Sequence, residues 1–469
     1  MIRKYRILLT VVVFIMAKAS LCMPIYVDDD ALNDPGPDNP TISDPLEDGS
    51  EEHPYDAIQE GIDNVVEGGI VSVASGTYIE NLLITKDICL SGEDALTTIV
   101  DADGIKKPIL IKNVEEGVDV CITGFTIMGS GSGYDDGLGN GGIFFHTWGK
   151  GNLEVSHCII KENAGQGITL TGPATITNNL IIDNFSVGIF VTSDGDATII
   201  NNTITSCGEA GIGIHYEATR AMLTNNIIAY NEVYGVSVFG DGPVIETNFN
   251  DYWGNGSGNR DLVLGLNDIL LKPEFMNPAN DDYRLQYNSP CIGAGDNSVV
   301  IVATDLDGNP RINGTNVDMG AYEVQCIEVA FDVKPTSCPN PLNVNSKGVL
   351  SVAIVGTEDL DVTHIDPASV QLMLLGPVRF HYEDVCTAYY PLVGKASQYD
   401  CTEEGPDGFM DMTLKFDNKA IAAALELIGG PLIDGEEILL TLTGNLLEEH
   451  GGTPIVGEDV VRIIKKGND

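Results

Sequence analysis

The chain of 469 residues carries 69 Asp and Glu residues against 24 Lys and Arg, a formal net charge of −45 at pH 7. A charge of this size repels nucleic acid and anionic membrane surfaces, so neither is expected as a partner. The length is sufficient for two or three domains.

Residues 1–19 have the pattern of a secretory signal peptide. Basic residues precede an apolar run over residues 7–16, and Ala17-Lys18-Ala19 fits a cleavage site. No other stretch is long and apolar enough to cross a bilayer. We therefore expect a secreted protein, extracellular or at the cell surface, without membrane insertion.

The stretch PYDAIQEGIDNVVEGG (54–69) predicts an amphipathic helix. Its apolar residues recur on one helical stripe, namely Ala57, Ile58, Ile62, Val65 and Val66. A helix at this place would close the open end of a solenoid, whose first coil otherwise exposes its core to water.

Beyond this helix the sequence repeats with a period of 21 to 24 residues. Four columns carry the repeat: Val155, Ile176, Ile199, Leu223 and Ile245; Asn179, Asn202, Asn226 and Asn248; Ile160, Ile181, Ile204 and Ile228; Gly167, Gly188, Gly211 and Gly235. Apolar residues within a repeat fall two apart, which is the spacing of strands. The repeat predicts a parallel β-helix in which like residues stack at about 4.8 Å.

Stacking gives the asparagines and some aliphatic residues distinct roles. The Asn column predicts a ladder of buried amides, each donating to one neighbour and accepting from the other. In contrast Ile159, Leu180, Ile182 and Ile227 should point outward and form an apolar patch. We expect the C-terminal module, or the segment leading into it, to cover this patch; a partner chain or a local twist of the coil are the alternatives.

Residues of about 24–265 resemble the pectin lyase-like superfamily of right-handed parallel β-helix proteins. The resemblance rests on the capping helix, the stretch IVSVASGTY (70–78) and the Asn and Gly columns. It implies an all-β fold with an N-terminal capping helix. The superfamily contains polysaccharide lyases, glycoside hydrolases and epimerases, and also surface proteins without known catalysis.

Two further segments complete the expected organisation. Residues 289–323 resemble the terminal motif of exported choice-of-anchor Q proteins, which implies that a segment of about 270–325 closes the far end of a β-helix domain spanning 24–325. From Cys326 the 23-residue period is lost, and strands alternate with turns. Residues 326–469 therefore predict a smaller β-sandwich accessory module, which resembles modules at the C-termini of bacterial secreted proteins.

The candidate site lies on the outward face of the strands that follow the column glycines. Aromatic rings spaced along a rigid sheet suit sugar rings, and imidazole can act as acid or base near neutral pH. The resemblance also points to an inserted loop after Gly129. The candidate catalytic residues are His146, His215 and Arg220, and the candidate ligand-binding residues are Asp135, Asp136, Phe144, Phe190, Phe239 and Glu217.

Five carboxylates within twelve residues of the C-terminal module form a candidate calcium site: Asp400, Glu403, Glu404, Asp407 and Asp411. Their density of hard oxygen ligands suits Ca²⁺. The alternative is an acidic surface loop exposed to solvent.

Eight of the ten cysteines divide into two groups. Cys89, Cys121, Cys158 and Cys207 lie in apolar runs and are expected to be buried thiols. Closely spaced loop cysteines predict two disulfides, Cys326–Cys338 and Cys386–Cys401. Cys291 is left unassigned.

Two functions fit these features. The first is a secreted polysaccharide lyase, hydrolase or epimerase. The second is a non-catalytic surface or matrix protein that binds glycan or calcium. Polysaccharide binding on the outer face of the sheet is common to both; the sugar, the linkage and the oligomeric state stay open.

Overall fold

The computed structural model describes residues 23–29, 46–132, 140–240, 242–286, 289–314, 316–450 and 452–465. The chain divides into two compact units, Met1–Ile312 with Asn316–Val324 and Asn313–Thr315 with Gln325–Asp469. The predicted signal peptide lies outside the described residues. Among the described helices, none is both long and apolar enough to span a membrane.

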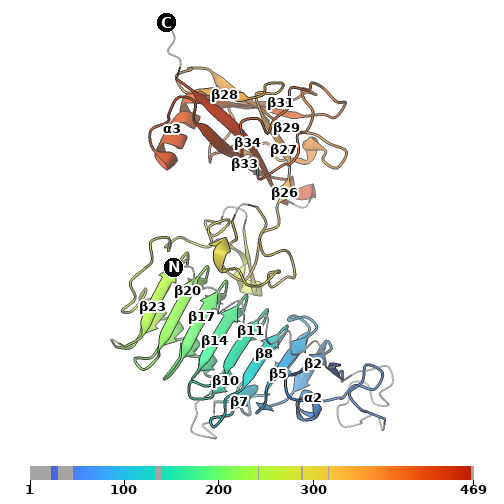
Figure 1. The fold of residues 1–469 in the computed structure, drawn as a ribbon, viewed down its shortest axis with the longest axis vertical. Coiled ribbons are helices and arrows are strands. Elements are labelled where there is room, and N and C mark those ends of the chain that lie inside the picture. The colour runs from blue at the N-terminus through green and yellow to red at the C-terminus, as the bar shows by residue number, and fades with distance from the viewer. Residues whose placement is uncertain are drawn as a thin grey trace. The chain divides into compact units, whose positions relative to one another are not determined.

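The first unit is a solenoid of three parallel sheets, whose stacked strands are visible in Figure 1. The first sheet contains β1 (Ile25–Val27), β2 (Gly69–Val73), β5 (Ile88–Gly92), β8 (Asp119–Thr123), β11 (Asn152–Ser156), β14 (Pro173–Thr177), β17 (Asp196–Ile200), β20 (Arg220–Thr224) and β23 (Val244–Asn248). The second sheet contains β4 (Leu82–Ile84), β7 (Ile109–Lys112), β10 (Gly141–His146), β13 (Gln166–Leu170), β16 (Val187–Val191), β19 (Ala210–Ile214) and β22 (Tyr234–Val238). The third sheet contains β3 (Gly76–Ile79), β6 (Thr98–Asp101), β9 (Thr126–Met128), β12 (Ile159–Lys161), β15 (Leu180–Ile182), β18 (Thr203–Thr205) and β21 (Ile227–Ala229).

Alternation along each strand fills the interior of the solenoid. The isoleucine column stacks in register through β12, β15, β18 and β21, and all four of its side chains are buried. The structure also explains the glycine column, because the backbone at these glycines lies close to the next coil. A Cβ atom on Gly167 would lie 2.6 Å from the carbonyl oxygen of Gly188, so a larger residue would clash.

The predicted amide ladder is confirmed except at its last rung. Asn179 Nδ2 donates to Asn202 Oδ1 at 3.0 Å, and Asn202 Nδ2 donates to Asn226 Oδ1 at 3.1 Å. The next acceptor is Asn250 rather than Asn248. Strand β23 pairs Thr247 with Leu223, so the true register lies two residues from the predicted one.

A second amide ladder was not predicted. Asn163 Nδ2 donates to Asn184 Oδ1 at 3.0 Å, and Asn231 Nδ2 donates to Asn255 Oδ1 at 2.9 Å. The thiol of Cys207 occupies the position between these two pairs, and the backbone N–H of Cys207 donates to Asn231. The solenoid is therefore stabilised by amide stacking at two corners.

The paired asparagines have different tasks. The first residue of each pair adopts a left-handed backbone, as at Asn201 with φ 55° and Asn225 with φ 59°. Their side chains donate outward, to the carbonyl oxygens of Asp318 at 3.2 Å and Asp296 at 3.0 Å. Asparagine tolerates this conformation better than most residues, which explains its recurrence at the corner.

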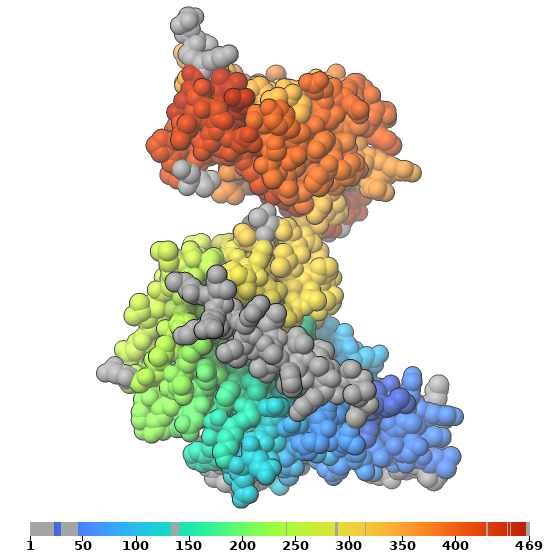
Figure 2. All heavy atoms as spheres, viewed as in Figure 1, coloured from blue at the N-terminus to red at the C-terminus, as the bar shows by residue number. Residues whose placement is uncertain are grey.

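The outward aliphatic patch is covered by the segment leading into the C-terminal module, as predicted. This segment contains β24 (Phe275–Asn277), η1 (Pro278–Asn280), β25 (Asp282–Leu285) and η2 (Asn297–Val299). Its side chains form one buried cluster with the outward residues of the third sheet, a cluster that includes Ile159, Leu180, Ile182, Ile227, Phe275, Tyr283, Leu285, Met319 and Tyr322. Figure 2 shows the segment, in yellow, against the later coils in green.

The contacts of this segment correct the expectation that it closes the far end of the solenoid. Instead it packs along the side, over third-sheet strands from several coils. The aliphatic patch explains this position, since burying it removes a large apolar surface from water.

At the N-terminal end, α2 (Ile58–Asn64) packs against β1, β2 and β4. Ile58 and Ile62 are buried, as the helical stripe predicted. The helix is shorter than predicted, because Val65 takes an extended backbone and Val66 is exposed.

The second unit contains two sheets that share one core. One sheet contains β26 (Ile327–Glu328), β28 (Asn340–Asn343), β30 (Gln371–Leu372), β33 (Glu437–Asn445) and β34 (Pro454–Ile464), and the other contains β27 (Ala330–Val333), β29 (Val349–Val355), β31 (Arg379–Tyr382) and β32 (Met412–Asp417). The unit also contains η3 (Val362–His364), η4 (Glu448–His450) and α3 (Asn418–Gly429), a helix that the strand pattern did not predict. Asp417 caps α3 by accepting two backbone N–H groups.

Both predicted disulfides are wrong in their pairing. The structure joins Cys338 to Cys401 and Cys89 to Cys121, and Cys386 is a free thiol. Cys89 and Cys121 are direct neighbours on β5 and β8, so stacking of coils brings them together. Cys158 and Cys207 are buried free thiols, as expected.

Candidate functional site

The candidate site lies on the outward face of the second sheet, near its last coils. In β16, β19 and β22 the inward positions are fully buried isoleucines and valines, as at Ile189 and Ile212. Alternation then directs Phe190 and Ser237 outward, and His215 and Phe239 lie directly after the strands. The outward placement of these residues agrees with the sequence pattern.

A pocket of about 240 Å³ lies on this face. Its lining residues are Val187, Glu209, Ala210, Gly213, Val233, Tyr234, Ser237, Phe239 and Arg260. The pocket thus combines two aromatic rings with a carboxylate, a hydroxyl and a guanidinium group. Small-molecule sites have this composition, an apolar lining with a few polar groups that orient the ligand.

Gly213 makes room for the pocket. It lies between Phe190 and Ser237 in the sheet, because β19 pairs with β16 on one side and β22 on the other. A Cβ atom on Gly213 would lie 2.9 Å from Cδ2 of Phe190. Because Gly213 has no side chain, the Phe190 ring can lie over β19. There it meets the rings of His215 and Phe239 edge-on, with 6.5 Å between ring centroids in each pair.

Ser237 supplies a polar group that the protein leaves unsatisfied. Its side chain is 2% exposed, and its Oγ has no hydrogen-bond partner among the described residues. A buried hydroxyl without a partner costs about 1–3 kcal/mol. Glu209 lies on the same pocket and accepts a hydrogen bond from Ser186 Oγ at 2.9 Å. Because Ser237 Oγ is itself buried, the polar groups of the pocket that a ligand can reach are those of Glu209 and Arg260.

Arg260 is a site residue that the sequence prediction missed. Its guanidinium lies over the Phe239 ring at 5.3 Å, and its Nε lies 3.6 Å from a carboxylate oxygen of Asp261. Backbone pairing places Arg260 beside Ser237 as the next rung of the sheet. Gly258 extends the glycine column by one repeat after Gly235, so this signal was present in the sequence.

His215 lies beside the pocket with Glu217. Its Nδ1 is 3.9 Å from Glu217 Oε2, and its ring contacts Tyr216 at 4.2 Å. The Ser193 hydroxyl donates to Glu217 and lowers the pKa of that carboxylate below its usual value. The structure therefore makes His215 and Glu217 neighbours, a pairing that the sequence analysis did not predict.

The other candidate histidine does not join this site. His146 and Phe144 point outward from β10, but both are buried, and the ammonium of Lys107 lies 5.5 Å over the Phe144 ring. Three strand steps separate β10 from β19 in the sheet, a distance of about 14 Å at 4.8 Å per step. The expectation that Phe144 and His146 offer an exposed surface is wrong, and His146 cannot share one reacting atom with His215.

Arg220, predicted to be catalytic, also lies away from the pocket. It begins β20 in the first sheet, where its Nη2 donates to Glu246 Oε2 at 3.0 Å rather than to Glu217. Its guanidinium is therefore paired on the first sheet, whereas the pocket lies on the second sheet. The candidates Asp135 and Asp136 lie outside the described residues.

The five carboxylates of the candidate calcium site do not converge. Asp411 is buried and accepts backbone N–H groups from Gly356, Val385 and Cys386. Asp400 accepts two backbone N–H groups of its own turn, and Glu403, Glu404 and Asp407 are exposed. Within the described ranges, no group of three or more potential ligands could hold a metal ion. Backbone N–H groups thus satisfy Asp411 and Asp400, and calcium binding stays a prediction.

Comparison with known proteins addresses the solenoid. Residues 113–266 match the family model described as "Right handed beta helix region". The solenoid is a right-handed parallel β-helix. A crystal structure of pectate lyase Pel9A is similar over 64% of this chain and 96% of that chain, with 13% sequence identity and a TM-score of 0.36. A search of curated proteins finds no match. A likeness of this extent leaves the activity open.

Proposed function

We propose that this chain binds a polysaccharide on the outer face of the second sheet of its β-helix, in the pocket at Ser237. The observation that carries the proposal is the composition of this pocket, which brings the rings of Tyr234 and Phe239 together with the exposed charged side chains of Glu209 and Arg260. A sugar ring matches this surface because its C–H groups can pack on the rings of Tyr234 and Phe239 while its hydroxyl groups bond to Glu209 and Arg260.

The shape of the face supports a chain ligand rather than a small free sugar. Phe190 and Phe239 lie on the same outward face, with ring centroids 6.5 Å apart, and Tyr234 lines the pocket beside them. Phe190 belongs to β16 and Phe239 follows β22, so the two rings offer apolar contacts on different coils along the solenoid axis. A polysaccharide that follows this axis would contact several of them at once.

Catalysis is the second candidate, favoured by the His215–Glu217 pair at the border of the pocket. A lyase, hydrolase or epimerase would need this imidazole within hydrogen-bond reach of the bound sugar. Binding and catalysis predict different outcomes for His215→Ala. If the parent protein forms product and His215→Ala loses product formation while its affinity is unchanged, the protein is an enzyme. If neither the parent nor the variant forms product and both bind equally, it is a binding protein.

The test is affinity electrophoresis of the full chain in gels that contain neutral glucans, galactans, xylans or polyuronates. The same polysaccharides are then incubated with the protein and assayed for reducing ends and unsaturated uronate absorbance. We expect retardation by at least one polysaccharide and its loss in Phe239→Ala. Absence of retardation by every polysaccharide would overturn the proposal.

A further inference from the structure

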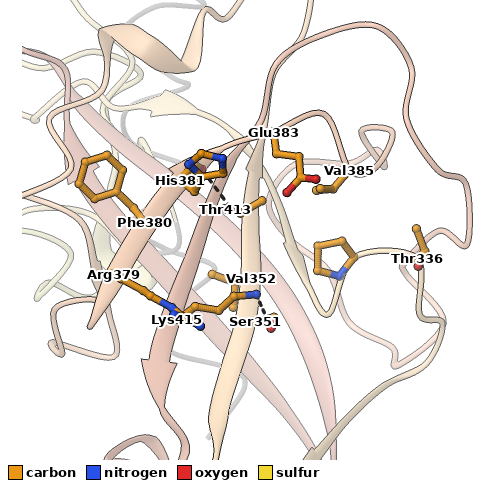
Figure 3. Close-up of a pocket in the computed structure, with 11 residues that line it drawn as sticks. Thr336, Ser351, Val352, Arg379, Phe380, His381, Glu383, Val385, Thr413 and Lys415 are labelled. Atoms are coloured by element: carbon orange, nitrogen blue, oxygen red, sulfur yellow. Dashed lines mark hydrogen bonds between the residues drawn. The ribbon is translucent and has the colours of Figure 1, made fainter.

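The C-terminal unit contains a larger pocket of about 510 Å³ on its four-stranded sheet. Its lining residues come from three strands and their adjoining loops: Pro335, Thr336, Ser351, Val352, Arg379, Phe380, His381, Glu383, Val385, Thr413 and Lys415. Figure 3 shows Arg379 and Lys415 reaching over the same part of the sheet, with Glu383 toward the other end of the pocket.

Two positively charged side chains of this pocket lie where their mutual repulsion lowers the stability of the fold. Arg379 and Lys415 are direct cross-strand neighbours on β31 and β32. Like charges in directly opposite positions repel, and their Cβ atoms lie about 4.5–5.5 Å apart in such a pair. Within the described part of the chain neither side chain forms a salt bridge, while Lys415 Nζ donates to Ser351 Oγ at 2.6 Å.

The other sheet of the same unit pairs its charges in the ordinary way. There Arg462 on β34 lies opposite Glu437 on β33, so a cation faces an anion. The chain has 69 acidic residues and only 24 Lys and Arg, so its composition offers more than enough carboxylates to pair every cation. The unpaired cations of the pocket therefore require another explanation.

We propose that this pocket binds the oxyanion groups of an acidic polysaccharide, either carboxylates of uronic acids or sulfate esters. A planar guanidinium with an adjacent ammonium matches such groups, and charge-assisted hydrogen bonds are about twice as strong as neutral ones. The hydroxyls of Thr336 and Thr413 and the imidazole of His381 line the same pocket and can bond to sugar hydroxyls. Nucleic acid also carries oxyanions, and a net charge of −45 opposes every polyanion, so the local contacts of the pocket must carry the binding and duplex DNA is included as a competing ligand in the test.

The experiment measures binding of the full chain to polygalacturonate, dextran sulfate, neutral dextran and duplex DNA at low and high NaCl concentrations. The test variant is Arg379→Gln with Lys415→Gln. Its matched control is Arg462→Gln with Lys465→Gln, which removes the same charge from the other sheet.

We expect binding to one of the two acidic polysaccharides, a tenfold or greater loss in the test variant, and less than a twofold change in the control. The polysaccharide retained identifies carboxylate or sulfate as the ligand. Equal affinities of test and control variants, or binding to DNA alone, would overturn the proposal. Neither variant alters the β-helix face, so the outcome is independent of the function proposed above.

A stability measurement gives a second readout. If Arg379 is held opposite Lys415 for binding, Arg379→Gln alone relieves repulsion, and its melting temperature at low salt is expected to equal or exceed that of the parent protein. A lowered melting temperature would show that Arg379 serves the fold and would count against a binding role.

Discussion

The side-chain amide of Asn202 lies between those of Asn179 and Asn226, accepting from the first at 3.0 Å and donating to the second at 3.1 Å. The same Nδ2 also donates to the carbonyl oxygens of Ile176 and Ile200, at 2.8 and 3.0 Å. One buried side chain thus satisfies polar groups on three coils.

Asn202→Leu is expected to destabilise the β-helix, because it removes the side-chain oxygen that accepts from the backbone N–H and Nδ2 of Asn179 and the Nδ2 that donates to Asn226. Each unsatisfied group costs about 1–3 kcal/mol, so we expect a loss of at least that size in urea unfolding. Asn267→Leu, on an exposed residue, is the control. Equal unfolding midpoints for the two variants would contradict the ladder.

Leu180→Asp is expected to release the segment of residues 275–322 from the side of the solenoid. The substitution places a carboxylate in the apolar cluster that Leu180 forms with Phe275 and Tyr283. Limited proteolysis should then cleave the segment faster, while circular dichroism keeps the β-helix signal. Ile79→Asp, at an exposed position, should leave the cleavage rate unchanged. If both variants are cleaved alike, the segment is not held by this cluster.

Both of these contacts show how far the sequence could predict the structure. Columns of like residues predicted the coils, the inner amide ladder and the covered patch. They could do so because stacking places equivalent positions of successive coils in the same environment. The Asn250 rung was missed because Ile245 and Asn248 offer the same residue types two positions earlier, and Arg260 was missed although Gly258 continues the glycine column. The disulfides were missed because sequence proximity says little about which loops meet, whereas the Cys89–Cys121 pair follows from stacking.

The candidate site was harder to predict, because burial determines which outward-pointing side chains a ligand can reach. Alternation identified the outward residues, yet it could not distinguish the exposed Phe239 from the buried Phe144. Nor could the density of carboxylates around Asp411 show that backbone N–H groups, rather than a metal ion, satisfy the buried one.

Asp251 is expected to make stability fall as the pH rises. It is buried beside Cys291, and burial raises its pKa to about 7. Between about pH 4 and pH 7 the folded state keeps a proton that the unfolded state has released, so stability declines across that window and levels off above it. Asp251→Asn should flatten the decline in thermal midpoint, and Asp103→Asn on the surface should not. An unchanged pH profile in Asp251→Asn would contradict this assignment.

Asp411→Ala is expected to destabilise the C-terminal unit through the backbone groups of Gly356, Val385 and Cys386 that it leaves without an acceptor. Hydrogen bonds to a charged group contribute about 1.5–3 kcal/mol each, so the loss should be on the order of 3 kcal/mol or more. Glu404→Ala should be neutral. Should both substitutions instead abolish a calcium-dependent rise in melting temperature, the five carboxylates would share an ion after all.

The most direct test of the proposed function is the dissociation constant of the full chain for the polysaccharide that retards it, compared between Phe239→Ala and Phe409→Ala. Both rings are similarly exposed, at 36% and 42%, but only Phe239 lines the pocket at Ser237. We predict at least tenfold weaker binding for Phe239→Ala, which corresponds to about 1.4 kcal/mol, and no change for Phe409→Ala. Equal dissociation constants for the two variants would contradict saccharide binding at this face.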